Sequence, residues 1–244
     1  MSVVICEYHD TRFDCNKYEI PYVATDKLSH TTDKVTLDLQ SPKDSNTNML
    51  LNISLVILAY LFGSLSAAVI VCKIMHLDDP RKHGSKNPGT TNVLRLHGKK
   101  AAALTLAGDL IKGLVPVLLV KLLGAPHLVI ALSALAAFCG HIFPIFFNFQ
   151  GGKGVATLVG VLLGMQWLLG AAFITSWLVI AFLFRYSSLA ALSAAALLPI
   201  FAIFLQEPAY YISSIVVMII ILFWRHRSNI RNLIAGKEDK IGIN

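Results

Sequence analysis

Charged side chains are scarce in this chain: of its 244 residues, 14% are Asp, Glu, Lys or Arg, whereas 55% are hydrophobic. This composition, with a mean hydropathy of +0.65, lies outside the usual range of soluble domains. The four cysteines show no CxxC and no spacing typical of a metal site. Residues 1–20 lack the continuous apolar stretch of a signal peptide. We expect no nucleic-acid partner for this chain.

The few charges divide the chain into two parts. Residues 1–48 are polar and carry 5 Lys or Arg against 8 Asp or Glu, a net charge of −3. Residues 49–244 carry 16 Lys or Arg against 6 Asp or Glu, a net charge of +10, and contain long apolar runs. The sequence therefore predicts a polar N-terminal extension over residues 1–48 and a basic membrane domain over residues 49–244.

Two explanations of the extension stay open. Met49 directly precedes the first apolar run, so we hypothesise that translation starts there and that residues 1–48 are an artefact or a dispensable, disordered segment. The competing view is an extension outside the membrane that is closed by a Cys6–Cys15 disulfide. N-terminal sequencing of the native protein decides between them.

Apolar runs with few charges predict the membrane spans. Residues 154–184 contain no charge over 31 positions. At 1.5 Å per residue this is about 46 Å of helix, too long for a hydrocarbon core of about 30 Å. We therefore predict two short helices hinged near Met165 and Gln166. The runs are residues 49–72, 101–120, 127–147, 154–184, 186–206 and 208–224.

Two short helices give seven spans and place the basic segments on one side. Of the 16 Lys and Arg in residues 49–244, 14 then face that side, a strong positive-inside bias. A single tilted helix would give six spans and turn the basic C-terminus outward. We predict an all-α integral membrane protein with about seven transmembrane helices, two of them short, and polar loops forming an active site on the cytoplasmic side.

Three polar segments fall on this basic side. Residues 78–100 combine hydroxyl, amide and cationic side chains with tight turns, which suits a phosphorylated polyol, although a solvated basic loop has the same composition. Residues 140–154 end in GGKG just before a predicted helix. Glycine backbone, a helix N-terminus and Lys153 together indicate a phosphate cradle, and the alternative is an ordinary turn.

The third segment, residues 225–237, combines arginines with His226, which could move a proton near neutral pH. Cations at a membrane exit are also routine anchors. Asp109 and Lys112 lie within a predicted span at a spacing that lets them pair on one helical face. We favour a structural role for this pair over one in positioning site cations.

The order and spacing of these segments resemble the bacterial acyl-phosphate:glycerol-3-phosphate acyltransferases, over about residues 49–240. Residues 84–95 read GSKNPGTTNVLR, against approximately GSGNxGATNxxR in the family. Residues 140–154 read GHIFPIFFNFQGGKG and match the family's GHxFPxFxxFxGGKG throughout. Residues 225–236 read RHRSNIRNLIAG, against approximately RHRxNIxRLxxG. Lys86 stands where the family usually has Gly, a poor substitution if that backbone has positive φ.

The resemblance implies transfer of a fatty acyl group from acyl phosphate to the 1-hydroxyl of glycerol 3-phosphate. The products would be 1-acyl-glycerol 3-phosphate and phosphate, in the first step of phospholipid synthesis. The resemblance further implies a bacterial inner membrane location, contact with membrane lipid, and no metal or other cofactor. An enzyme that produces acyl phosphate is a candidate partner.

The resemblance also implies roles for individual residues. Ser85, Lys153 and His226 are the candidate catalytic residues, with either His226 or a substrate phosphate as proton acceptor. The candidate binding residues share amide, backbone or cationic groups that suit phosphate and hydroxyl, and comprise Asn87, Asn92, Arg95, His141, Gly151, Gly152, Gly154, Arg227 and Asn229.

Two other functions fit parts of this pattern. A transporter of a phosphorylated solute would also have several spans and phosphate-binding segments, but its site would lie near the midplane within an internal repeat. We find no such repeat, and the polar residues crowd one side. A non-catalytic membrane scaffold would explain the anchoring cations but not the intact GGKG and RHRxNI sequences.

Overall fold

A computed structural model describes residues 2–9, 12–19 and 45–242. The chain divides into two units, Met1–Pro42 and Lys43–Asn244. In the first unit, β1 (Ser2–His9) and β2 (Arg12–Glu19) form an antiparallel pair whose register places Cys6 opposite Cys15. The sequence predicted no strands there. Side chains of this hairpin lie outside the described part, so the disulfide and the start at Met49 stay predictions.

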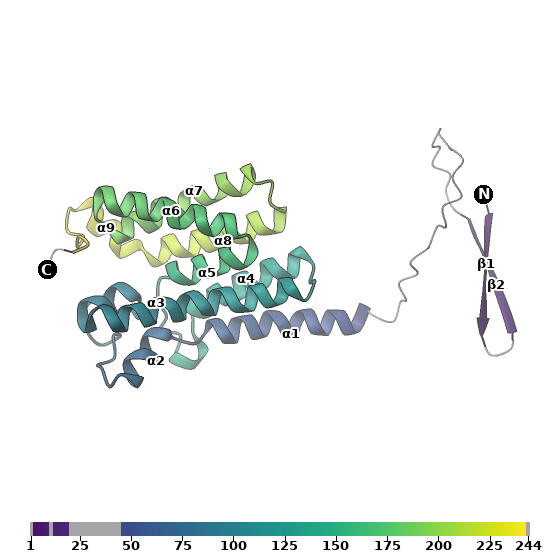
Figure 1. Cartoon of the computed structure of the whole chain (residues 1–244), viewed down its shortest axis with the longest axis horizontal. Helices are drawn as coiled ribbons and strands as arrows, with labels where there is room; N and C mark the ends of the chain where they lie inside the picture. Colours follow the sequence, from purple (N-terminus) through teal and green to yellow (C-terminus); the bar gives the residue numbers. More distant parts are fainter. Residues whose placement is uncertain (1, 10–11, 20–44, 243–244) are drawn as a thin grey trace. The chain divides into compact units, whose positions relative to one another are not determined.

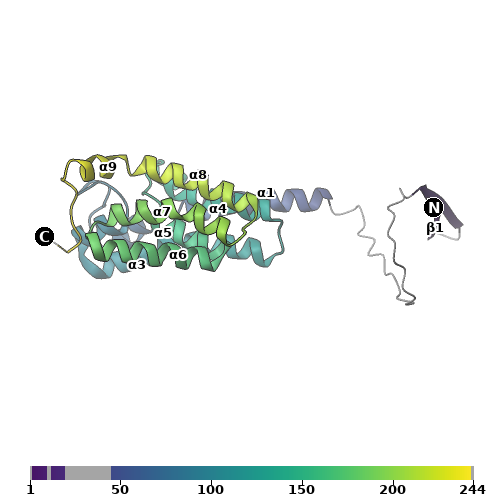
Figure 2. The same ribbon diagram turned by 90° about the horizontal axis from the view of Figure 1, so that it is seen from above.

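The second unit is a bundle of helices that run lengthwise beside one another (Figure 1, Figure 2). Residues 45–242 contain helices and loops but no strand, which confirms the all-α prediction for the membrane domain. The elements are α1 (Ser45–Gly63), α2 (Ala67–Ile74), α3 (Thr90–Leu122), α4 (His127–Ile142), η2 (Ile145–Phe147), α5 (Val155–Met165), α6 (Trp167–Phe184), α7 (Ser187–Phe204), α8 (Ala209–Arg225) and α9 (Arg227–Ile234).

Four helical segments are long and apolar enough to cross a membrane: α3, α4 together with η2 (His127–Phe147), α6 and α7. Two further spans are bent: α1 with α2 at 47°, and α8 with α9 at 59°. Large apolar side chains face outward from this bundle, for example Phe182 at 85% and Phe204 at 82% exposure. Such a surface requires lipid, so the chain is a multi-pass membrane protein. The count of seven stays a prediction because it requires α5 as a span.

The apolar run 154–184 forms two helices, as predicted, with the break at Gln166 in extended conformation. Lys121 at the end of α3 donates from Nζ to the Met165 carbonyl at 2.7 Å, so this end of α5 has a partner for one of its free carbonyls. With 11 residues, α5 is about 16 Å long, only half of a hydrocarbon core of about 30 Å.

Short α5 begins level with the middle of α3. A Cβ on Gly113 of α3 would meet the Thr157 carbonyl, and one on Gly164 would meet the Val117 side chain at 2.9 Å. The two helices therefore run side by side in the same direction, in contact through small residues as is common between membrane helices. The loop that precedes α5 consequently enters the bundle instead of staying at its end.

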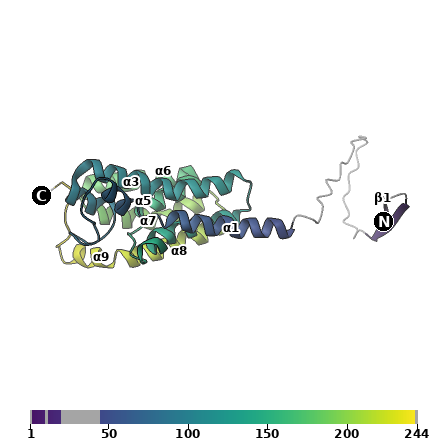
Figure 3. The same ribbon diagram turned by 90° about the horizontal axis from the view of Figure 1, so that it is seen from below.

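The predicted polar segments gather at one end of the bundle. Contacts join them: Arg225 binds the 150–154 loop, Arg95 pairs with Asp239, and Arg185 bonds with Ile241. Figure 3 shows α9 at this end, opposite the start of α1. The common location predicted for the basic segments is thus confirmed, while their side of the membrane stays a prediction.

Single cysteines can test this sidedness in a background without the four native cysteines. Cysteines at Lys99 and Ser228 should be protected from a membrane-impermeant thiol reagent in intact cells, because positively charged ends face the cytoplasm. A cysteine at Leu123, in the connection at the opposite end, should react. All three should react after permeabilisation, and labelling of the Ser228 position from outside would overturn the assignment.

Candidate active site

The glycine loop, residues 150–154, is fixed by Arg225 from the end of α8. Arg225 donates from Nη2 to the Gly151 carbonyl at 2.6 Å and from Nε to the Gly152 carbonyl at 3.0 Å. The Gly152 N–H donates to the His141 carbonyl at 3.3 Å. Both carbonyls thus turn toward a cation, and the start of α5 directly follows. The first N–H groups of a helix have no partner within it, so they are free to receive an anion.

The three glycines in this loop have no room for a side chain, and at Gly151 an added Cβ would collide with the His141 and Ile142 carbonyls. A Cβ on Gly152 would collide with the imidazole of His141 at the end of α4. Gly154 has φ +90°, and its Cβ would collide with the Phe138 ring. Alanine is therefore excluded at Gly152 by space, and at Gly154 by space and backbone conformation. The predicted site residues His141, Gly151, Gly152 and Gly154 lie together.

Lys153 points toward the third segment. Its Nζ donates to Asn229 Oδ1 at 2.5 Å, and the Asn229 amide donates to Glu238 Oε1 at 2.7 Å. Burial lowers the pKa of Lys153 below that of an ordinary lysine, while the nearby carboxylate of Glu238 opposes this effect. Lys153 and Asn229, both predicted as site residues, are thus brought together by the fold.

The first segment lies against the glycine loop, since a Cβ on Gly152 would come within 3.2 Å of the Pro88 carbonyl. Asn92, at 2% exposure, holds this segment in shape. It accepts from the Ser85 N–H and donates to the Pro80 and His83 carbonyls. The sequence had predicted Asn92 as a substrate-binding residue. Both of its amide hydrogens are in use within the loop, so in this structure Asn92 orders the loop.

Ser85, Asn87 and Arg95 remain available at this end. Ser85 is exposed, and Asn87 lies beside Gly89. Arg95 is partly exposed and pairs through Nη1 with Asp239 Oδ2 at 2.9 Å. Because Asp239 directly follows Glu238, the C-terminal segment connects Arg95 to the Asn229–Lys153 pair. The three predicted segments therefore form one cationic site.

The third segment differs in detail from the prediction. His226 is 3% exposed, and its Nδ1 donates to the Leu222 carbonyl at 2.9 Å. Arg227 lies over the Trp224 ring and donates to the Trp224 carbonyl, with no contact to the glycine loop among the described interactions. Arg225, which was not among the predicted site residues, makes the contact to the loop. Because α8 and α9 meet at a bend of 59°, the facing direction of each arginine did not follow from sequence.

Glu238 is a second residue that sequence reasoning missed. Its carboxylate accepts from Ser188 Oγ at 2.6 Å as well as from Asn229. Two adjacent carboxylates, Glu238 and Asp239, in an otherwise basic C-terminal stretch were the available signal. Within the residues that the structure describes, no three or more His, Cys, Asp or Glu side chains form a cluster that could hold a metal ion.

The family model described as glycerol-3-phosphate acyltransferase matches residues 53–236. A protein named glycerol-3-phosphate acyltransferase from Thioalkalivibrio sulfidiphilus is 52% identical over 194 residues, covering 80% of this chain and 96% of its own length. One of the same name from Burkholderia multivorans is 54% identical over 190 residues, covering 76% of this chain and 89% of its own.

Two solved structures are also similar to this chain. Both are crystal structures of PlsY (YgiH), an integral membrane glycerol 3-phosphate acyltransferase, in the glycerol 3-phosphate form and the lysophosphatidic acid form. They are 36% identical to this chain, cover 79% of it and 96% of their own chains, and give TM-scores of 0.75 and 0.74.

Lys86 offers a test of the first segment because it has φ +57°, the conformation that favours glycine. Lys86→Gly should raise stability by about 1 kcal/mol, the cost of a left-handed backbone for a residue with a Cβ. Thermal unfolding in detergent measures the change. Lys82→Gly, an exposed position in the same loop without positive φ, is the control and should not stabilise. If Lys86→Gly and Lys82→Gly destabilise the protein equally, the backbone at Lys86 is not strained.

Proposed function

Because the chain belongs to the glycerol-3-phosphate acyltransferase family, we propose that it uses acyl phosphate to acylate the 1-hydroxyl of glycerol 3-phosphate. The products are 1-acyl-glycerol 3-phosphate and inorganic phosphate. One observation carries this proposal: the glycine loop, with Lys153 and Arg225, lies beside the start of α5 and joins two further polar segments. Two anionic substrates need such adjoining cationic positions.

The reaction needs positioning more than activation. Acyl phosphate is a mixed anhydride, so the hydroxyl oxygen attacks the acyl carbon directly and the bond to phosphate breaks, with no covalent acyl-enzyme required. The glycine loop and Lys153 hold the acyl phosphate, and charge on the departing phosphate grows as the bond breaks. Ser85, Asn87 and Arg95 hold glycerol 3-phosphate on the adjoining first segment.

The hydroxyl proton goes to a substrate phosphate in this proposal. His226 is buried, and one of its ring nitrogens is used on the Leu222 carbonyl. This environment suits a residue that packs and orders the α8–α9 bend better than one that meets a soluble substrate. Asn229, one turn further on, supports Lys153. Arg227 anchors Trp224 at the same end.

The membrane location follows from the charges and the substrates. We assign the site to the cytoplasmic side of a bacterial inner membrane, because the basic end of the bundle carries the site. Glycerol 3-phosphate reaches it from water, whereas the acyl chain and the product remain in lipid. A transporter would need polar groups continuing through the bundle to the other end. The break at Gln166 is instead closed by Lys121 and the Met165 carbonyl.

The deciding assay incubates purified protein in detergent or lipid with labelled glycerol 3-phosphate and one of three donors: acyl phosphate, acyl-CoA or acyl-acyl-carrier protein. Labelled 1-acyl-glycerol 3-phosphate should form with acyl phosphate alone. If product forms with acyl-CoA or the carrier protein but not with acyl phosphate, the proposal that acyl phosphate is the donor is wrong. No product with any donor, together with uptake into proteoliposomes, would support a transporter.

Two substitutions separate space from charge in the glycine loop. Gly152→Ala pushes against the His141 ring and should mainly raise KM for acyl phosphate. Lys153→Ala removes a charged hydrogen bond, worth about 1.5–3 kcal/mol, and should lower kcat by about 10- to 150-fold. Steady-state kinetics with each substrate varied in turn measures both. A rise in KM for glycerol 3-phosphate alone would reverse the assignment of the two substrate positions.

The pH dependence of kcat tests Lys153 separately. The protonated form of a lysine is lost as pH rises through its pKa, and burial lowers the pKa of Lys153. Activity should therefore fall at a lower pH than an exposed lysine would give. Lys153→Arg, which stays charged, should keep part of the activity and abolish this fall. An unchanged alkaline fall in the Arg variant would assign the titration to another group.

A further inference from the structure

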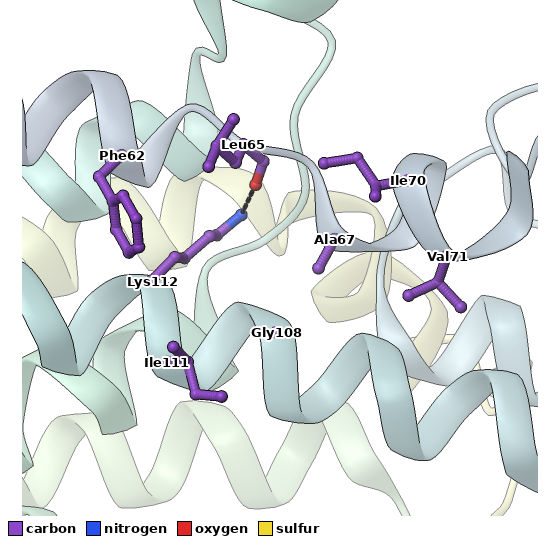
Figure 4. Close-up of a pocket in the computed structure, with 8 residues that line it drawn as sticks. All are labelled: Phe62, Leu65, Ala67, Ile70, Val71, Gly108, Ile111 and Lys112. Atoms are coloured by element: carbon purple, nitrogen blue, oxygen red, sulfur yellow. Dashed lines mark hydrogen bonds between the residues drawn. The ribbon is translucent and has the colours of Figure 1, made fainter. Parts of the chain in front are cut away.

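A line of buried polar groups connects the α1–α2 break to the glycine loop. At the break, the Leu65 carbonyl accepts from Lys112 Nζ at 2.7 Å (Figure 4). Lys112 Nζ lies 2.8 Å from Asp109 Oδ1, one turn back along α3. Asp109 Oδ1 in turn lies 3.5 Å from Nδ1 of His141 on α4. The three ionisable side chains are each at most 6% exposed.

A purely structural ion pair does not account for this whole line. Ionisable groups inside a membrane are costly, and paired ones are retained where they serve a site or hold helices together. Lys112 has the Leu65 carbonyl and the Asp109 carboxylate as partners. His141 is different, because its buried Nδ1 has no hydrogen-bond partner among the described residues and faces Asp109 Oδ1, also without one by the same criterion, at 3.5 Å.

The other side of His141 faces the glycine loop. Its carbonyl accepts from the Gly152 N–H, and its ring edge at Nε2 and Cε1 occupies the space where a Gly152 side chain would lie. His141 therefore contacts the loop through both backbone and ring. A rotation of the ring by half a turn would place the carbon Cδ2, instead of Nδ1, toward Asp109 and would exchange Nε2 and Cε1 beside Gly152.

We propose that Asp109 is a positioning residue, which holds the Nδ1–H of His141 toward its carboxylate and so fixes Nε2 against the glycine loop that binds acyl phosphate. A carboxylate beside one ring nitrogen fixes both the tautomer and the orientation of an imidazole. Lys112 keeps Asp109 in place by pairing with it and by binding the Leu65 carbonyl. The role toward acyl phosphate rests on the proposed function.

A double-mutant cycle tests this coupling. Asp109→Asn keeps the size of the side chain but removes its charge, and His141→Ala removes the ring. Each should lower kcat/KM for acyl phosphate by about 10- to 150-fold, the range for a charged hydrogen bond. If Asp109 acts through His141, the double variant should lie within about twofold of His141→Ala. Losses that multiply would overturn the proposal.

A second pair of variants separates positioning from stability. Asp109→Asn combined with Lys112→Met removes both charges, so no unpaired charge remains buried. A purely structural pair predicts recovery of both thermal stability and turnover in this variant. Positioning predicts that stability recovers while kcat/KM for acyl phosphate stays low. Ser133→Ala removes a buried hydroxyl elsewhere on α4. It is the matched control and should leave the kinetics unchanged.

A readout without turnover distinguishes failure of this proposal from failure of the proposed function. Ring ¹⁵N chemical shifts of His141 in labelled wild-type protein report its tautomer. They should show Nδ1 protonated, and Asp109→Asn should change them while Ser133→Ala does not. This result would stand even if acyl phosphate proved not to be the donor. A His141 signal that is unaffected by Asp109→Asn would overturn the positioning role.

Discussion

The requirement that buried backbone groups be hydrogen-bonded governs this structure at the segment between α4 and α5. That segment is irregular, yet it enters the bundle because α5 is too short to reach the end. Within a membrane, irregular backbone is tolerated only where protein satisfies it or a water-filled cavity lies beside it. Here Tyr60 binds the Phe143 carbonyl, Arg225 binds the Gly151 and Gly152 carbonyls, and His141 accepts from Gly152. The residues that allow the loop to exist are therefore the residues that shape the site.

The charges of the site follow from this arrangement. Arg225 compensates loop carbonyls, so part of its charge is directed at backbone, while Lys153 is directed at Asn229 and Arg95 at Asp239. Left alone, these cations would repel one another. The carboxylates of Glu238 and Asp239 offset them, through Asn229 in one case and directly at Arg95 in the other. Both carboxylates come from the short segment after α9, which is the reason that a segment outside the matched residues 53–236 still contributes to the electrostatics of the site.

Much of this arrangement could be predicted from sequence, for identifiable reasons. Comparing helix length with bilayer thickness predicted the break near Gln166. The positive-inside bias predicted that the basic segments lie at one end. Comparison of residues 84–95 with the family motif, which has Gly at the position of Lys86, correctly suggested a positive φ there. What could not be predicted depends on tertiary contacts. Whether Asn92 turns to its own loop or to a ligand depends on carbonyls at Pro80 and His83. Whether Arg225 or Arg227 meets the loop depends on the bend between α8 and α9.

The contact between Asp109 and His141 shows this limit most clearly. Sequence placed Asp109 and Lys112 on one face of a helix but gave no register between α3 and α4. Both helices are held at glycines by their other neighbours: α4 packs on α1 at Gly140, and α3 packs on α5 at Gly113 and Gly160, each without room for a side chain. Close packing thus determines which polar groups meet inside the bundle. Since a single added methyl at one of these glycines would separate the helices, the same small residues that hold the bundle together also bring a carboxylate from one span to the imidazole at the end of another.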